Sequence, residues 1–118
     1  MMLINTATDR VVARKVELAS TFGQRLRGLM GRRGMPKGSA MLLYPCNAIH
    51  TCFMRFSIDI VFLNREGYVL VIIPKLPPFR FAGPVKESQL VVELPAGETA
   101  DAQIEIGHKL KFAYKIKR

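Results

Sequence analysis

Residues 58–63 constrain the fold more than any other stretch, because they place one carboxylate, Asp59, inside an otherwise apolar run. Side chains of a strand alternate between two faces, and here both faces are apolar apart from Asp59. The pattern therefore predicts a central strand with Asp59 at least partly buried. A buried carboxylate must be paired, hydrogen-bonded or protonated. Arg55 and His50 are its nearest candidate partners in the sequence.

The length and hydrophobic content indicate one domain spanning residues 1–118, large enough to bury about two thirds of its unfolded surface. Hydrophobic residues make up 49% of the chain, yet no apolar run reaches the ~20 residues of a transmembrane helix. The first residues lack the basic start and long apolar centre of a signal peptide. We therefore expect a cytoplasmic protein without membrane insertion, in which Cys46 and Cys52 are reduced thiols.

The chain carries a formal net charge of +9, so its surface should attract anions such as phosphates and nucleic acids. The cations fall into a first group near the expected helix and a second group near the C-terminus. These are Arg25, Arg27, Arg32, Arg33 and Lys37, then Lys109, Lys111, Lys115, Lys117 and Arg118. No aromatic residues alternate with these charges as a base-stacking platform requires. We expect nucleic-acid binding to be weak and salt-sensitive at most.

One helix is expected at residues 22–31. Thr21 and Gln24 have the spacing of a capping box, and apolar residues follow at helical spacing from Phe22 to Met30. Gly31 ends the pattern.

The remaining periodic segments read as short strands joined by tight turns. They are residues 3–5, 11–18, 40–44, 48–54, 58–63, 68–73, 89–94 and 109–117. Residues 58–63 and 68–73 should pair as a hairpin, and the proline-rich residues 75–84 should form an ordered loop. The fold class is mainly β, at the margin of α+β: a compact antiparallel sandwich or barrel with one short amphipathic helix.

Three motifs, in this order, resemble those of the domain of unknown function 192 family. They are Arg25-x-x-Gly28-Leu29-Met30, the run from Ile49 to Leu63 containing His50-Thr51 and Ile58-Asp59, and Glu93-Leu94-Pro95-Ala96-Gly97. The family occurs in bacteria and archaea and has no assigned activity. The resemblance extends over residues 13–112 and implies a compact, mainly β domain with a short helix. Ser57, Cys52 and His108 depart from residues usual in the family, which are proline, an aromatic residue and aspartate.

The cysteines and histidine of residues 46–52 suggest two kinds of chemistry. Cys46, His50 and Cys52 are potential zinc ligands, but a fourth ligand is missing and the spacing matches no known zinc motif. A thiol nucleophile would need His50 within hydrogen-bond reach. We favour structural thiols and expect no metal and no cofactor.

Arg55 and Asp59 allow two interpretations. They form either a structural ion pair or part of a site in which Arg55 grips an anion through its fork of donors. His50 or Asp59 would complete that site, and Glu93 is an outside candidate for it.

Three functions follow from these residues. The first is a small binding domain for an anionic small molecule or extended peptide, at a cleft near His50, Arg55 and Asp59. The second is an acid–base enzyme, resembling a hydrolase, that uses His50 and Asp59. The third is a nucleic-acid or anionic-surface binder, favoured if the helix arginines and the C-terminal lysines form one continuous basic face.

Overall fold

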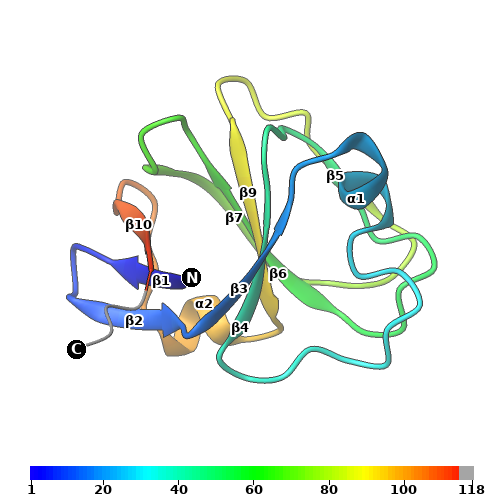
Figure 1. The fold of residues 1–118 in the computed structure, drawn as a ribbon, viewed down its shortest axis with the longest axis horizontal. Coiled ribbons are helices and arrows are strands. Elements are labelled where there is room, and N and C mark those ends of the chain that lie inside the picture. Colours follow the sequence, from blue (N-terminus) through cyan, green and yellow to red (C-terminus); the bar gives the residue numbers. More distant parts are fainter. Residues whose placement is uncertain (115–118) are drawn as a thin grey trace.

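A five-stranded sheet forms the centre of the computed structural model, which describes residues 1–114 (Figure 1). Its strands, in spatial order, are β3 (Lys15–Ala19), β4 (Ser39–Leu43), β9 (Leu90–Pro95), β6 (Ile58–Leu63) and β7 (Val69–Leu76). Only β3 and β4 run parallel; the other neighbours are antiparallel. All six residues of β6 are buried between β9 and β7, so the predicted central strand and its hairpin with β7 are confirmed.

Two smaller sheets complete the β structure. One has the order β10 (Leu110–Ala113), β1 (Met2–Asn5), β2 (Arg10–Ala13), and the other pairs β5 (Ile49–His50) with β8 (Phe81–Ala82). The mainly β fold with a short helix is confirmed, and across residues 1–114 the sheets remain open rather than closing into a barrel.

Each face of the central sheet is covered by a different layer, which explains the apolar character of both faces of β6. Leu3, Val12 and Leu110 of the three-stranded sheet, with α2 (Glu98–Asp101), pack on the face that carries Val61 and Leu63. The other face packs against the loops around α1 (Phe22–Arg27) and β5. In Figure 1 these two layers lie on opposite sides of the sheet.

The helix α1 begins as predicted, with reciprocal capping by Thr21 and Gln24, but it is shorter than predicted. It ends at Arg27 because Gly28 adopts φ 46°, a conformation that side chains disfavour. The predicted apolar face is also wrong. The chain turns Leu29 into the core, while Phe22 and Leu26 remain 74% and 54% exposed. No helix within residues 1–114 has the length and apolar content needed to span a membrane.

Several predicted strand boundaries are wrong, for local reasons. Residues 11–18 divide into β2 and β3 at Arg14, whose N–H bonds to the Gly38 carbonyl as the chain changes sheets. Residues 48–54 keep only the two-residue β5. The expected loop 75–84 contains the end of β7 and β8, and α2 is an additional helix. The C-terminal strand ends at Ala113, and the predicted Lys115, Lys117 and Arg118 lie outside the described residues.

Candidate functional site

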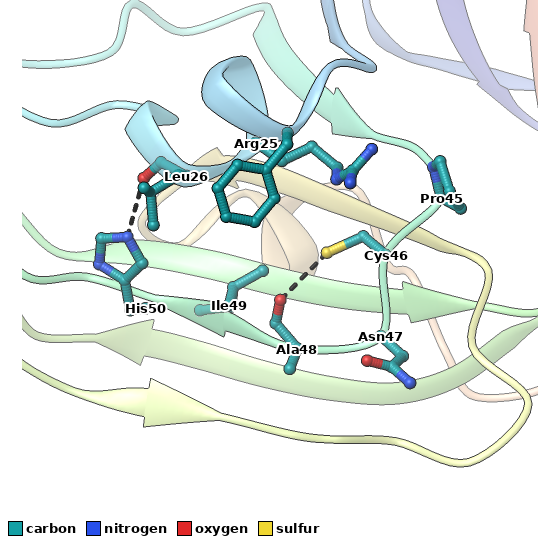
Figure 2. Close-up of a pocket in the computed structure, with 9 residues that line it drawn as sticks. Arg25, Leu26, Pro45, Cys46, Asn47, Ala48, Ile49 and His50 are labelled. Atoms are coloured by element: carbon teal, nitrogen blue, oxygen red, sulfur yellow. Dashed lines mark hydrogen bonds between the residues drawn. The ribbon is translucent and has the colours of Figure 1, made fainter.

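A cleft of about 310 Å³ lies between α1 and residues 45–50 (Figure 2). Its lining consists of Phe22, Arg25, Leu26, Pro45, Cys46, Asn47, Ala48, Ile49 and His50. This set contains one permanent cation and no carboxylate. The cleft is therefore mainly apolar, with polar groups at a few positions, as is usual for small-molecule sites.

Backbone hydrogen bonds fix the cleft wall opposite α1. The Cys46 N–H donates to the Gln89 carbonyl at 2.9 Å, and the Val85 N–H donates to the Asn47 carbonyl at 2.8 Å. Residues 45–47 are thereby attached to segments that come forty residues later in the chain. The cleft wall is part of the folded structure and does not need a ligand to form.

His50 joins that wall to the helix through both of its ring nitrogens. Nε2 lies 2.8 Å from the Leu26 carbonyl oxygen, and Nδ1 lies 3.1 Å from the Cys52 backbone nitrogen. A ring with its proton on Nε2 satisfies both bonds, donating to Leu26 and accepting from Cys52. Neither nitrogen is then free to transfer a proton or bind a metal, so His50 acts as a support of the cleft.

Cys46 is the thiol inside the cleft. Its Sγ–H donates to the Ala48 carbonyl at 3.0 Å, and burial raises the pKa of the thiol above its ordinary value. A raised thiol pKa disfavours the thiolate that nucleophilic attack requires. Both cysteines are unbridged in the structure. Within residues 1–114, no three His, Cys, Asp or Glu side chains gather as a metal site would require.

Arg25 is the cation of the cleft. One of its terminal nitrogens donates to the Ser20 carbonyl at 2.7 Å, which leaves other donors of the guanidinium available. The ion pairs among the described residues do not include Arg25. In Figure 2 its guanidinium lies on the same side of the cleft as Cys46 and Pro45, pointing away from His50. The cleft thus contains a positive charge that forms no ion pair among the described residues.

Asp59 is fully buried and receives hydrogen bonds only from uncharged donors. The N–H groups of Lys75 and Gly97 reach one oxygen at 2.9 and 3.0 Å, and the N–H and hydroxyl of Thr99 reach the other at 2.9 and 2.6 Å. Burial opposes the charge, but these bonds together lower the pKa of Asp59 below its ordinary value. The carboxylate ties the end of β7 and the start of α2 to β6.

The structure does not bring the four predicted site residues together. Arg55 is exposed, and no ion pair joins it to Asp59 among the described residues. Asp59 shares its face of the sheet with Val61 and Leu63, whereas His50 follows Ile49, which packs on the opposite face. His50 and Asp59 share no hydrogen bond, so the geometry of an acid–base pair is absent.

Glu93 is another buried carboxyl group, and it lies on the face of the sheet that α1 covers. Its Oε1 atom has no hydrogen-bond partner, and burial raises its pKa to about 8, although the positive charge of Arg32 opposes that shift. Arg32 itself is held by Glu17 through two bonds of 2.8 Å. Glu93 is 2% exposed and does not line the cleft.

Sequence reasoning missed Arg25 and Cys46 as neighbours in one cleft. The only sequence signal for Arg25 is its place in the motif that ends at Met30. The sequence does not distinguish it from the other cations near the expected helix. The helix that carries Arg25 is joined to residues 45–50 by the bond between His50 and the Leu26 carbonyl, groups that lie 24 residues apart and that no local pattern connects.

Comparison with known proteins places the chain among uncharacterised relatives. The family model DUF192, described as "Uncharacterized ACR", matches residues 3–112. A UPF0127 protein of Pyrococcus furiosus is 30% identical over 115 residues, which cover 93% of this chain and 97% of that protein. A UPF0127 protein of Thermococcus sibiricus is 32% identical over 121 residues, covering 99% of this chain and 78% of the relative.

Two solved structures share the fold. One is a protein of unknown function from Novosphingobium aromaticivorans, with a TM-score of 0.82 and 22% identity, covering 94% of this chain and 82% of that one. The other is described as a candidate transcription regulator from Sinorhizobium meliloti, with a TM-score of 0.79 and 25% identity, covering 93% and 89% of the two chains.

Proposed function

Because this chain belongs to the DUF192 family, whose description assigns no activity, we propose a function from the site alone: it is a small binding domain. Its cleft, between α1 and residues 45–50, holds a small anion with an apolar body. The ligand's anionic group contacts Arg25, and its apolar part lies against Phe22 and Leu26.

One observation supports this proposal above the others: Arg25 lines an apolar cleft that contains no carboxylate. An arginine fork recognises carboxylate and phosphate groups through paired hydrogen bonds. Phe22 and Leu26 leave 74% and 54% of their surfaces exposed beside it. Covering that apolar surface with a ligand would add a favourable hydrophobic contribution to binding.

The chemistry of the lining favours binding over catalysis. Both ring nitrogens of His50 and the thiol of Cys46 are engaged in hydrogen bonds that build the cleft itself. No general base within reach of a ligand remains among these groups. A volume of about 310 Å³ lies at the lower end of the range for ligand pockets, so the ligand is small.

A thermal-shift screen tests the proposal. The panel should contain aliphatic and aromatic carboxylates, the matching phosphates, uncharged amides of the same acids, and short peptides with free or amidated C-termini. We expect acids with an apolar body to raise the melting temperature and the isosteric amides to leave it unchanged. Equal effects of acids and amides would show that charge recognition by Arg25 plays no part.

A positive result with the free-acid peptides alone would identify the ligand as an extended peptide that presents its terminal carboxylate. Mass spectrometry of molecules that co-purify with the protein complements the screen. The cytoplasmic location expected from the sequence stays a prediction.

A further inference from the structure

We propose that a second surface, beside the cleft, binds single-stranded nucleic acid by stacking bases on exposed phenylalanines. This aromatic face consists of Phe53, Phe79 and Phe81, with Arg55 and Arg80 interleaved among them in the sequence. The aromatic face extends beyond the cleft. The only cleft-lining residue that it includes is His50, whose ring lies next to Phe81.

The three phenylalanines are exposed to an unusual degree for side chains of this type. Phe53, Phe79 and Phe81 are 64%, 60% and 79% accessible. Phe53 and Phe79 form an edge-to-face pair with centroids 5.8 Å apart, and the Phe81 ring lies 6.5 Å from the His50 ring. The two ring pairs are connected through the chain, because Phe79 and Phe81 are separated only by Arg80.

A buried threonine holds this surface in place. Thr51 is fully buried, and its hydroxyl donates to the Pro77 carbonyl at 2.7 Å and accepts from the Arg80 N–H at 2.9 Å. The backbone of Thr51 adds two bonds, accepting from the Phe79 N–H and donating to the Arg80 carbonyl. Residues 77–80 are thus attached to the segment that carries Phe53.

That network keeps two phenylalanines in backbone conformations that bulky residues avoid. Phe53 has φ 63° and Phe79 has φ 61°, both in the left-handed region. Such conformations persist only where surrounding contacts determine them. The backbone that carries these two exposed rings is therefore determined by its surrounding contacts.

The charge around the aromatic face suits a polyanion. The sequence from Leu18 to Ile58 contains six lysines and arginines and no acidic residue, and the sequence from Gly67 to Lys86 contains three and none. Both segments contribute to the aromatic face. Arg55 and Arg80 are exposed, as is Lys75 near the end of β7, and none of the three forms an ion pair among the described residues.

A single strand fits this arrangement better than a duplex does. Unpaired bases offer their faces to aromatic side chains, while cations beside them contact the phosphates. The alternation Phe79-Arg80-Phe81 supplies both groups, and the cation groups near the helix and the C-terminus have no such alternation. Lys111 of β10 belongs to the three-stranded sheet, which lies on the other side of the molecule from α1 (Figure 1).

Fluorescence anisotropy with a labelled oligothymidine, and with a duplex of equal length, tests the proposal. At low salt we expect the single strand to bind more tightly than the duplex. Phe79→Ala and Phe81→Ala should each weaken binding by roughly five- to a hundredfold, which corresponds to the loss of one stacked base. Arg80→Gln should reduce the slope of log affinity against log salt concentration by about the amount expected for one phosphate contact.

Two matched variants control for general effects. Tyr114→Ala removes an aromatic ring that is 82% exposed, and Arg65→Gln removes one charge beside β10. Both should bind the oligothymidine as the wild type does. Circular dichroism and melting temperature verify folding, and if Phe79→Ala is misfolded, Phe81→Ala decides.

Three results would overturn the proposal. They are no binding of the single strand at low salt, wild-type affinity in the folded phenylalanine variants, or duplex binding as tight as single-strand binding. Vesicles containing phosphatidylserine serve as a further arm. Phenylalanine-dependent binding to those vesicles, without binding to the oligothymidine, would assign the face to a membrane surface instead.

Discussion

Asp59 and Glu93 are buried carboxyl groups on neighbouring strands, β6 and β9, and they point to opposite faces of the sheet. Asp59 pairs in register with Leu94, and Glu93 pairs with Ile60. Four donors satisfy Asp59, whereas the Oε1 atom of Glu93 has no partner. The pKa of Asp59 is lowered and that of Glu93 is raised to about 8. The same sheet therefore holds one carboxylate and, below that pH, one neutral acid.

Replacement of Asp59 should destabilise the fold, and replacement of Arg55 should not. Asp59→Ala leaves the donors of Lys75, Gly97 and Thr99 without a partner, a loss of about 1–3 kcal/mol or more in the free energy of unfolding. Arg55→Ala removes an exposed side chain and should change stability by less than about 0.5 kcal/mol. The loss in the free energy of unfolding of the double variant should equal the sum of the losses in the two single variants. Denaturant midpoints of the two single variants and the double variant measure these losses. Equal losses in the two single variants, with strong coupling between them in the double variant, would indicate an ion pair between Arg55 and Asp59 instead.

Glu93 should make stability depend on pH near neutrality. The unfolded chain loses the proton of Glu93 near the ordinary pKa of 4.5, but the folded protein retains it up to about pH 8. The folded state binds more protons in that window, so stability should fall as pH rises through it and level off above. The total change in the free energy of unfolding across this pH range is several kcal/mol at most, since each unit of pKa corresponds to about 1.4 kcal/mol.

Glu93→Gln keeps the shape of the neutral acid and should abolish this dependence. The variant should match the wild type near pH 4.5 and exceed its stability above pH 8. Denaturant midpoints across that range provide the measurement, with Glu87→Gln as a control at an exposed carboxylate. Parallel pH curves for wild type and Glu93→Gln would contradict the assignment of a neutral Glu93.

Two glycines near α1 should respond oppositely to alanine. Gly28 has φ 46°, so Gly28→Ala should cost roughly 1–2 kcal/mol from backbone strain, even though the added Cβ would have ordinary contacts at 3.8 Å. Gly23 lies inside the helix with nothing within 4 Å, so Gly23→Ala should stabilise by roughly 0.5–1 kcal/mol. The melting temperatures of Gly28→Ala and Gly23→Ala, each compared with that of the wild type, measure these opposite effects on stability. Stabilisation by both substitutions would show that the helix continues past Arg27.

The sequence allowed the local features to be predicted. The capping box of Thr21 and Gln24 and the burial of Asp59 both follow from residues a few positions apart, and both are confirmed. The partners of Asp59 were beyond such reasoning. Thr99 lies forty residues away and reaches Asp59 only because β9 pairs with β6.

The cleft was hidden from the sequence for a related reason. Helical spacing places Phe22 and Leu26 on one face, but it does not state what covers that face. In the structure nothing within the described residues buries these two side chains, and they become the exposed rim of the cleft. Phe53 and Phe79 are likewise far apart in the sequence, and hydrogen bonds between Thr51 and residues 79 and 80 join the segments that carry them.

Isothermal titration of the best acid from the ligand screen, into wild type, Arg25→Gln and Arg27→Gln, tests the central claim most directly. Both arginines belong to α1, but only Arg25 lines the cleft. Loss of a charge-assisted bond to the ligand should weaken binding by about 1.5–3 kcal/mol, or roughly ten- to a hundredfold, in Arg25→Gln. Arg27→Gln should retain wild-type affinity. Equal affinity in all three proteins, or an equal loss in both variants, would contradict a specific anion site at Arg25.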